Sequence, residues 1–361
     1  MASYFFVPPL AKLSGGLAVV YQVAQCLHQL GHATYLVSRD NTTPGLGQAG
    51  VPVLNWAQLS LKPQDIWVVP EGWPNALAPG LEAGCCNLVY VQNWAYLFSA
   101  LPQGVRWQQL DVSFLAVSTP VAAFIKQTIG ADAHILRPGI DLSLLCPNPE
   151  TGNAQLLKSK GPVKSLNIAW MPRKNKVLAV QARQILQARG RVNTHLNWLE
   201  ISGKSRQEVA AMLQQCHIYL GTGFPEGLGL PPLEAMACGA IPVTCTGYGG
   251  WDYLRQIPLD LCKNADLDLA AQDVLAGLLP PNFSNLPGAQ PLALPYNAFV
   301  TPDADPISMA LALEYAASLV LSKGPLLEQI LQNGQTTACV YSLAEQKSNV
   351  QALWNIIMSR V

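Results

Sequence analysis

The chain alternates short runs of apolar residues with longer segments in which apolar residues recur every three or four positions. The short runs predict strands, and the periodic segments predict helices. In the first half, Gly31 ends the first periodic segment, as glycine often ends a helix. The strands expected here are 3–7, 33–37, 66–69, 88–91 and 114–117, and the helices are 17–30 and 119–129.

A stretch rich in proline and glycine, residues 136–164, interrupts this alternation and is typical of a connection between domains. A second alternation follows it. Its expected strands are 166–170, 195–201, 218–221 and 241–245, and its expected helices are 177–188, 205–215 and 232–238. A last amphipathic helix is expected over 342–357, whereas the proline-rich residues 277–306 give no clear element.

The duplicated alternation predicts an α/β protein of two Rossmann-like, doubly wound domains, because short connections of this kind favour parallel strands covered by helices. We expect the domains to face each other across a cleft, since ligands of open parallel sheets bind beyond the carboxyl ends of the strands. The expected boundaries are 1–145 for the first domain, 146–165 for a linker, 166–340 for the second domain and 341–361 for the last helix.

Composition narrows the classes of partner. Half of the residues are hydrophobic, only 12% are charged, and 22 basic residues balance 22 acidic ones. Residues 1–150 hold six basic and eight acidic residues, a net charge of −2, which leaves 16 basic and 14 acidic residues, a net charge of +2, in the remainder. Neither half has the cationic excess that nucleic acid or an anionic lipid surface attracts, so we expect neither as a partner.

The cysteines and the apolar segments indicate in which cellular compartment the protein is expected. The nine cysteines form no C-x-x-C pair and no metal-ligand spacing, which favours free thiols in a reducing environment. No basic region precedes an apolar run at the amino terminus, so no signal peptide is expected. The best candidate for a membrane span, residues 307–320, is short and contains Glu314. The pattern predicts a cytoplasmic protein without a strong membrane signal.

The segment 223–239, GFPEGLGLPPLEAMACG, concentrates residues suited to binding and chemistry. Glu226 is expected in a loop after a strand, and Glu234 lies eight residues later on the first turns of a helix. Gly227 and Gly229 allow close approach of a ligand to the backbone. A carboxylate so placed could bridge two ribose hydroxyls while the other faces a reacting sugar. An isolated glutamate would more often be a solvated residue stabilised by the helix dipole.

This string resembles the E-x7-E signature of retaining GT-B glycosyltransferases, the "group 1" family, and the likeness extends to AMACGAIPV and to Gly249-Gly250. The resemblance implies that Glu234 binds the ribose of a nucleotide-sugar donor and that Glu226 contacts the transferred sugar as the catalytic carboxylate. It also implies that the last helix returns to the first domain. The donor-binding residues expected around this carboxylate are Gly227, Leu228, Gly229 and Glu234.

Two further segments are expected at the donor. IAWMPRKNK places Arg173, Lys174 and Lys176 just after a strand, where cations suit a diphosphate whose charge grows as the sugar leaves. Either lysine could take the phosphate role, and a solvated charged loop is the plainer interpretation. Gly15 and Gly16 follow the first strand, and the resemblance implies that this turn approaches the donor phosphates and the acceptor.

Aromatic and polar residues gather in loops of the first half. They could stack on, or hydrogen-bond to, an acceptor sugar, although aromatic residues more often belong to a core. The expected acceptor-binding residues are Trp73, Gln92, Asn93, Trp94 and Tyr96.

The resemblance implies a retaining hexosyltransferase that moves a sugar from a nucleoside diphosphate sugar to a carbohydrate or other hydroxyl acceptor, as in polysaccharide biosynthesis. We expect no cofactor and no metal, since Asp303-Ala-Asp305 lies in a proline-rich loop and the cations would come from arginine and lysine. The main alternative is a non-catalytic protein that binds a nucleotide sugar or a partner on the same fold. An epimerase or a phosphorylase on this fold is a further one, whereas the glycine spacing argues against a Rossmann oxidoreductase.

Overall fold

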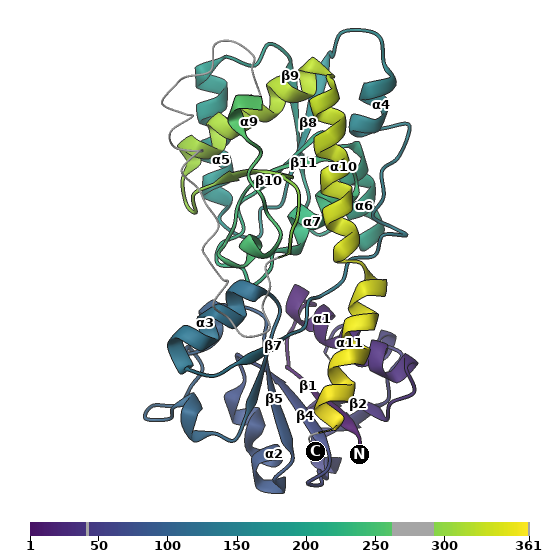
Figure 1. Ribbon diagram of the computed structural model, residues 1–361, viewed down its shortest axis with the longest axis vertical. Helices are drawn as coiled ribbons and strands as arrows, with labels where there is room; N and C mark the ends of the chain where they lie inside the picture. Colours follow the sequence, from purple (N-terminus) through teal and green to yellow (C-terminus); the bar gives the residue numbers. More distant parts are fainter. Residues whose placement is uncertain (41–42, 262–291, 360–361) are drawn as a thin grey trace. The chain divides into compact units, whose positions relative to one another are not determined.

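The computed structural model describes residues 1–40, 43–261 and 292–359, which form two compact units. The first unit contains Met1–Gly139 and the carboxyl-terminal stretch from Leu343 onward. The second is built from the described residues between Ile140 and Ser342. Each unit has one sheet of parallel strands with helices against it, so the α/β class expected from the sequence is confirmed (Figure 1).

The first unit contains a seven-stranded sheet in the order β3-β2-β1-β4-β5-β6-β7. All described pairs are parallel. Its strands are β1 (Ser3–Val7), β2 (Thr34–Ser38), β3 (Val53–Asn55), β4 (Ile66–Pro70), β5 (Cys86–Val91), β6 (Ser113–Ala116) and β7 (Ala133–Ile135). Its helices are α1 (Gly15–Gln29), α2 (Ala78–Ala83), α3 (Thr119–Ile129) and α11 (Leu343–Met358). The strand order reverses between β1 and β4, which is where doubly wound sheets bind ligands.

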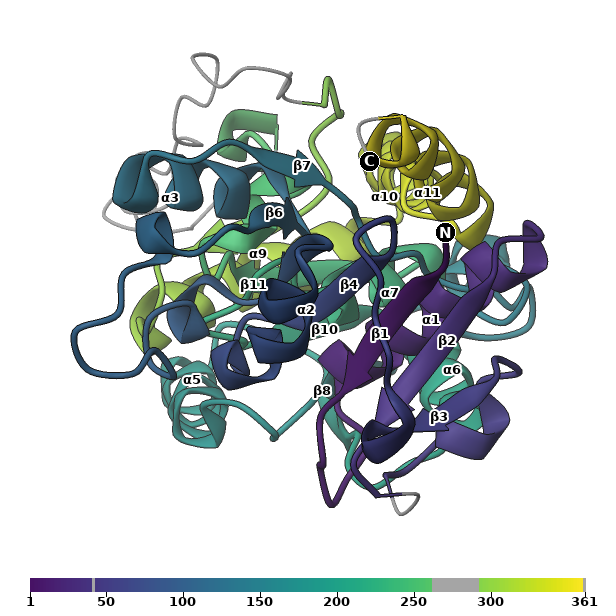
Figure 2. The ribbon, with the colours of Figure 1, turned by 90° about the horizontal axis from the view of Figure 1, so that it is seen from below.

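Local sequence explains where these helices begin. The Ser14 hydroxyl accepts a hydrogen bond from the Leu17 amide at 3.1 Å, which satisfies one of the free amides at the start of α1. The last helix, α11, lies beside α1 (Figure 2). Its Trp354 is fully buried, stacks on Phe5 with ring centroids 5.9 Å apart, and donates from Nε1 to the Ser3 hydroxyl at 2.9 Å. The carboxyl-terminal helix thereby completes the core of the first unit.

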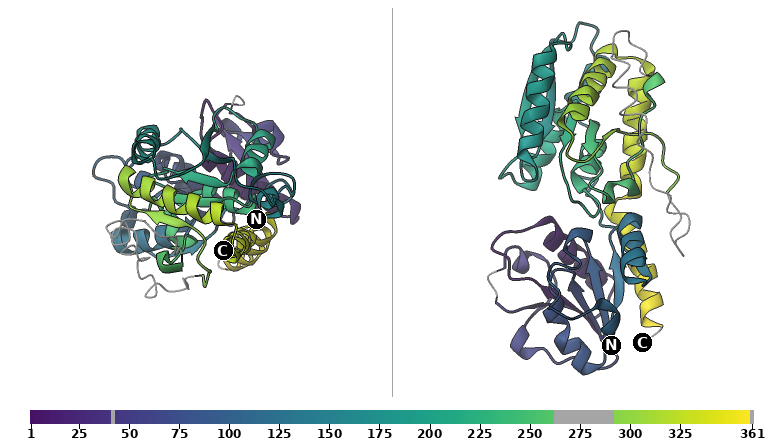
Figure 3. Two further views of the ribbon diagram at one scale, coloured as in Figure 1. Left: turned by 90° about the horizontal axis from the view of Figure 1, so that it is seen from above. Right: turned by 90° about the vertical axis from the view of Figure 1, so that its left-hand side faces the viewer.

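The second unit contains a five-stranded parallel sheet in the order β12-β11-β10-β8-β9. Its strands are β8 (Ser165–Trp170), β9 (His195–Glu200), β10 (Ile218–Gly221), β11 (Ile241–Cys245) and β12 (Phe299–Thr301). Its helices are α4 (Gly152–Lys158), α5 (Lys176–Arg189), α6 (Arg206–Gln215), α7 (Leu230–Ala237), α9 (Pro306–Ser322) and α10 (Pro325–Val340). Helices α5 and α9 lie side by side, as Figure 3 shows, and α10 packs on α7.

The segment 146–165, expected as a linker, lies instead within the second unit. Residues Gly152–Lys158 form α4, and three hydrogen bonds at its start hold this helix in place. Asn153 donates from Nδ2 to the backbone carbonyls of His217 and Gly239, each at 2.9 Å, and Thr151 donates to the Gln214 carbonyl at 2.8 Å. Proline and glycine in this stretch therefore mark short turns around a helix rather than a free connection.

The apolar segment 307–320 belongs to α9, which lies in the core of the second unit. Its Glu314 is almost fully buried and accepts two hydrogen bonds from the Arg189 guanidinium, at 2.6 and 3.2 Å. Among the described residues no single helix is long and apolar enough to cross a membrane. Helices α9 and α10 pass that test only together, with a bend of 114° between them.

Candidate active site

The residues predicted for the donor lie at one edge of the second sheet. Strands β8, β10 and β11 are neighbours and parallel, so the loops that follow them emerge side by side. The chain runs from β8 outward to β9 and then returns to the opposite side of β8 with β10. This is a topological switch point, and ligands of doubly wound sheets bind beyond the strands at such a point. The fold therefore brings together three loops that the sequence keeps far apart.

The loops after β8 and β10 are braced against each other by Asn175. This residue adopts a left-handed conformation, with φ of 53°, just before α5. Its side-chain amide donates to the carbonyls of Thr222 and Phe224, each at 2.9 Å. The Thr222 hydroxyl returns a hydrogen bond to the Lys174 carbonyl at 2.9 Å. Three reciprocal bonds thus hold the two loops in register.

Lys174 and Glu226 form an ion pair across these braced loops. The distance from Nζ to Oε1 is 2.9 Å, and Nζ also donates to the Pro225 carbonyl at 2.6 Å. The two side chains are 22% and 20% exposed, so the pair is open to a ligand from one side. Because a lysine ammonium carries three donors, one remains for an incoming anion.

The other two predicted cations have different surroundings. Arg173 is exposed, and its side chain makes no hydrogen bond or ion pair with any described residue. Lys176 is the first residue of α5, and its ammonium lies 6.0 Å from the centre of the Trp170 ring. Of the two lysines, the structure therefore brings Lys174 to the candidate carboxylate and leaves Lys176 beside the end of β8.

A glycine turn after β11 packs against the loop that carries Glu226. The Glu226 amide donates to the Gly247 carbonyl at 2.9 Å, and the Gly249 amide donates to the Glu226 carbonyl at 3.1 Å. A Cβ atom added at Gly249 would lie only 2.0 Å from the Gly227 carbonyl oxygen. Gly247 has a positive φ of 57°, and an added Cβ there would lie 2.6 Å from the Gly223 oxygen. Only glycine permits this close approach of two backbones.

Helix α7 begins at the end of the same loop. Gly229 precedes it in a left-handed conformation, and the Tyr253 hydroxyl donates to the Gly229 carbonyl at 2.6 Å. Glu234 lies on this helix and is half-buried; burial raises the pKa of its carboxyl, and Arg206 partly opposes the rise. Glu234 and Glu226 both contribute to the raised pKa of buried Tyr253, so both carboxylates lie near that ring.

A small cavity of about 30 Å³ lies beneath the loop, enough for a water molecule. Its walls are formed by Tyr219, Gly221, Gly223, Glu226, Leu228, Gly229, Pro231, Pro232, Thr244, Cys245, Thr246 and Tyr253. Leu228 is buried, so its side chain packs beneath the loop. Only the backbone of this residue is therefore placed to contact a ligand.

The two aspartates between β12 and α9 have structural partners. Asp303 accepts a hydrogen bond from the Gly247 amide at 3.0 Å, and burial raises the pKa of its carboxyl. Asp305 caps α9 by accepting from the amides of Ile307 and Ser308. Asp303 therefore supports the glycine turn described above.

The predicted residues of the first unit lie after β1, β4 and β5. Gly15 and Gly16 are the first residues of α1, and a Cβ added at Gly16 would lie 3.0 Å from Gln92 Oε1, so the α1 turn and the loop after β5 are in contact. Asn93 is buried, and its side-chain oxygen accepts from the Ala95 amide at 3.1 Å, which caps the short turn Trp94–Tyr96.

The aromatic residues of these loops divide into two groups. Trp73 and Trp94 are partly buried, with ring centroids 5.9 Å from Phe6 and 5.5 Å from Phe124. Tyr96 is 49% exposed. The two tryptophans therefore contribute to packing in the first unit, and Tyr96 offers the most open ring.

Glu71, directly after β4, is not among the site residues predicted from the sequence. It is only 5% exposed, its Oε1 accepts from the Asn93 amide at 2.8 Å, and burial raises the pKa of its carboxyl to about 7. A buried carboxyl at the switch point of the first sheet is typical of a functional position. The signal in the sequence is a glutamate that directly follows an apolar strand.

Comparisons with known proteins agree with this arrangement. The model of the family described as glycosyl transferases group 1 matches residues 191–256, which include the loop with Glu226, helix α7 and the glycine turn. A putative glycosyltransferase, ORF330 of Acidianus filamentous virus 2 (isolate Italy/Pozzuoli), is 31% identical over 64 residues. That match covers 18% of this chain and 19% of the viral protein, so it spans about a fifth of the relative's length.

Solved structures that resemble the chain over nearly its whole length include the following two. A glycosyltransferase from Rickettsia africae ESF-5 has a TM-score of 0.63 at 15% identity and covers 100% of this chain and 99% of its own. Anabaena Alr3699/HepE, solved in complex with UDP and glucose, has a TM-score of 0.61 at 12% identity and covers 98% of this chain and 99% of its own. Likeness at such identity establishes the fold. The chain therefore has the two-domain GT-B fold, and its residues 191–256 are similar to the glycosyl transferases group 1 family.

Proposed function

We propose that this protein is a retaining glycosyltransferase that moves a hexosyl group from a nucleoside diphosphate sugar to a hydroxyl of a carbohydrate or similar acceptor. The observation that supports it best is the convergence of Arg173, Lys174 and Glu226 with the Gly247–Gly250 turn. These residues come from three neighbouring strand ends at the switch point of the second sheet.

The donor is proposed to bind with its diphosphate on the loop after β8. Arg173 is exposed and without a partner among the described residues, so its guanidinium is available for bidentate contact with a phosphate. Lys174 contributes its remaining donor and its charge. The Anabaena relative was solved with UDP and glucose, which have the chemistry proposed here for the donor. Glu234, on α7, is proposed to accept hydrogen bonds from the ribose hydroxyls.

During transfer the bond between the anomeric carbon and the phosphate oxygen breaks, and a bond from that carbon to the acceptor oxygen forms. Negative charge grows on the leaving diphosphate, where Arg173 and Lys174 stabilise it. Positive charge develops on the sugar, where the Glu226 carboxylate is proposed to stabilise it. As Lys174 is drawn to the diphosphate, its hold on Glu226 weakens, and the carboxylate becomes more available to the sugar.

Retention of configuration follows if the acceptor attacks from the side that the diphosphate leaves. The acceptor hydroxyl then gives its proton to the departing phosphate oxygen, so no protein base is needed. We propose that the reaction needs no divalent metal, because the two cations after β8 can carry the charge of the leaving group. The loops after β4 and β5 of the first unit, with Gln92 and Tyr96, are the proposed contacts of the acceptor.

A ligand screen followed by product analysis tests this proposal. UDP-, GDP- and ADP-sugars are expected to raise the melting temperature if they bind the folded state, and the best donor is then incubated with oligosaccharide acceptors in the presence of EDTA. NMR of the product should show the anomeric configuration of the donor. An inverted product would reject the retaining mechanism. Tight donor binding with neither transfer nor hydrolysis would instead favour a non-catalytic nucleotide-sugar-binding protein.

A further inference from the structure

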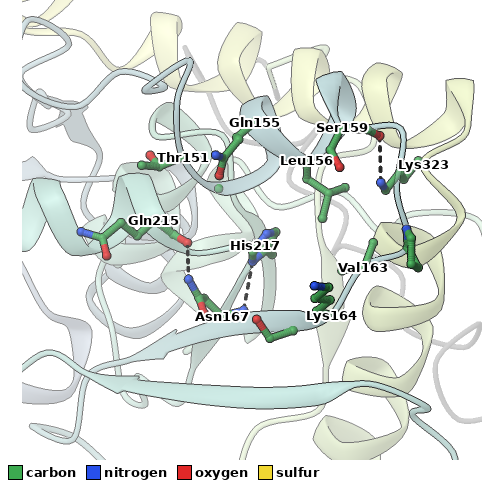
Figure 4. Close-up of a pocket in the computed structure, with 13 residues that line it drawn as sticks. Thr151, Gln155, Leu156, Ser159, Val163, Lys164, Asn167, Gln215, His217 and Lys323 are labelled. Carbon is green, nitrogen blue, oxygen red and sulfur yellow. Dashed lines mark hydrogen bonds between the residues drawn. The ribbon is translucent and has the colours of Figure 1, made fainter.

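A second and larger cavity lies within the second unit (Figure 4). Its volume is about 470 Å³, within the range of pockets that bind small molecules. It is lined by α4, the segment that leads into β8, the first half of β8, the end of α6, the residue before β10, and the residue that ends α9. The lining residues are Thr151, Gly152, Gln155, Leu156, Ser159, Pro162, Val163, Lys164, Ser165, Asn167, Gln215, His217 and Lys323.

This cavity and the candidate active site lie at opposite ends of the same strands. Lys164 directly precedes β8, and His217 directly precedes β10. The loops with Arg173 and Glu226 follow the other ends of these strands. The six residues of β8 span roughly 20 Å at the usual rise of a strand. A molecule in this cavity would therefore not occupy the donor site.

The charged side chains among the described lining residues of the cavity are both lysines. The described lining residues include Lys164 and Lys323 and no acidic side chain. Lys323 donates from Nζ to the carbonyls of Ser159 and Gly161, at 3.0 and 2.8 Å, which leaves one of its three donors free. Lys164 is exposed and makes no hydrogen bond or ion pair with the part of the chain that the structure describes. The cavity thus offers cationic donors, with no acidic side chain among its described lining residues.

His217 adds a buried donor. It is 8% exposed, and its Nδ1 accepts a hydrogen bond from the Asn167 amide at 2.9 Å. Burial lowers the pKa of the imidazole to about 4, so the ring is neutral at pH 7. Since Nδ1 accepts, the proton resides on Nε2. No described residue accepts a hydrogen bond from Nε2, and an imidazole N–H that is almost buried favours an acceptor that enters the cavity.

Figure 4 places His217 near the middle of the cavity, between Leu156 of α4 and Asn167 of β8, with Lys164 and Lys323 on one side. We propose that this cavity binds a small polyhydroxylated anion with the size and charge of a sugar phosphate. Lys164 and Lys323 hold the anionic group, and His217 donates from Nε2. The side chains of Gln155 and Ser159 are then placed to meet hydroxyls, and Leu156 offers an apolar surface to the carbon skeleton.

Calorimetry of the full chain with glucose 6-phosphate tests the proposal. Removing one charge-assisted hydrogen bond typically weakens binding by roughly tenfold, and that loss is expected for Lys164→Gln. Lys160→Gln is the matched control, because Lys160 is exposed in the same segment and does not line the cavity. This variant should bind glucose 6-phosphate with the affinity of the wild type. His217→Asn preserves an acceptor for the Asn167 amide and removes the Nε2 donor, so it should also weaken binding while the fold is kept.

Competition separates this site from the donor site. Saturating UDP should leave the affinity for glucose 6-phosphate unchanged, and glucose and inorganic phosphate should each bind more weakly than the sugar phosphate. Displacement by UDP, or equal affinity of the wild type, Lys164→Gln and His217→Asn, would overturn the assignment. If inorganic phosphate bound as tightly as glucose 6-phosphate, the proposal that the ligand is polyhydroxylated would be overturned. A protein that binds glucose 6-phosphate but no nucleotide sugar would keep this proposal and reject the proposed function.

Discussion

Lys174 and Glu226, separated by about 50 residues in the chain, form an ion pair of 2.9 Å at the carboxyl ends of β8 and β10. The pair connects the loop proposed to bind the diphosphate with the carboxylate proposed to face the sugar. We propose that it also links donor binding to the chemical step, because an anion that attracts Lys174 would release Glu226 from its partner.

Glu226→Gln is expected to reduce kcat about 10-fold or more with a small change in the donor KM. The carboxylate is proposed to stabilise charge that appears only in the transition state, so its loss should affect the chemical step rather than ground-state binding. Steady-state kinetics of transfer measure both constants. Glu328→Gln, an exposed position on α10, is the control and should match the wild type. A Glu226→Gln protein with wild-type kcat would remove the catalytic role from this residue.

Glu234→Gln is expected to behave differently, raising the donor KM more than it lowers kcat. Glu234 is proposed to bind ribose hydroxyls equally in the ground state and the transition state, and uniform binding of this kind appears in KM. The same kinetic assay decides, with nucleoside diphosphate inhibition as a second measure of affinity. If kcat fell and KM stayed constant, the proposed roles of the two glutamates would have to be exchanged.

Much of the fold follows from the sequence because local signals are strong. Helix α3 begins and ends where expected, since Ser118 caps it, Pro120 lies in its first turn and Gly130 ends it in a left-handed conformation. The strands that the sequence does not predict, β3, β7 and β12, have three residues each, too few for any periodicity to show. Helix α9 is not predicted as a helix because apolar residues cover most of its surface, so no polar face reveals its period.

The candidate site is predictable in part. The spacing of Glu226 and Glu234 indicates a loop carboxylate and a helix carboxylate, and the structure places them in those elements. The choice of Lys174 over Lys176 as partner of Glu226 requires the tertiary fold, since Asn175 braces the loop after β8 against the loop after β10. The burial of Glu71 likewise depends on how β4 and β5 pair, which no local pattern encodes.

Arg173→Ala should weaken binding of UDP, or of the nucleoside diphosphate that the screen selects, by about 1.5–3 kcal/mol, which is roughly a 10- to 150-fold rise in Kd. The arginine is exposed and has no partner among the described residues, so its removal should leave the fold intact. Calorimetry at two salt concentrations measures the loss, and the wild type should bind less tightly at high salt. Lys160→Ala controls for the change in net charge. Equal affinity of wild type and Arg173→Ala would reject the diphosphate contact.

Gly249→Ala should impair donor binding through the backbone rather than through a lost side chain. The new Cβ would lie 2.0 Å from the Gly227 oxygen, so the loop with Glu226 must move. Overpacking of this kind typically costs about 1–3 kcal/mol of stability. Thermal unfolding and UDP calorimetry should both show the change. Gly161→Ala is the control, because nothing lies within 4 Å of its added Cβ, and this variant should behave as the wild type. If the Gly249→Ala variant had the stability and the UDP affinity of the wild type, the turn would accommodate the added Cβ and the prediction would be wrong.

The pH dependence of stability should reveal the buried carboxyl of Glu71. Burial raises its pKa from 4.5 to about 7 in the folded state, so folding favours the protonated form. The contribution of this group to the free energy of unfolding is fully present below pH 4.5. It is lost as the pH rises through 7. Each pKa unit corresponds to about 1.4 kcal/mol. Relative to Glu71→Gln, the free energy of unfolding of the wild type should therefore fall by about 3 kcal/mol between about pH 5 and about pH 8.

The Glu71→Gln variant isolates this effect because other titrating groups are common to both proteins. His217, whose pKa is lowered to about 4, acts in the opposite direction. Its contribution to the free energy of unfolding is present above pH 6.5 and is lost as the pH falls through 4. Its contribution cancels in the difference between wild type and Glu71→Gln. The substituted amide keeps an oxygen that can accept from the Asn93 amide, so the variant should fold. Urea unfolding at several pH values across this range measures the difference. Parallel pH profiles for the two proteins would mean that Glu71 stays ionised in the folded state, with its charge balanced by the backbone amides that it accepts from.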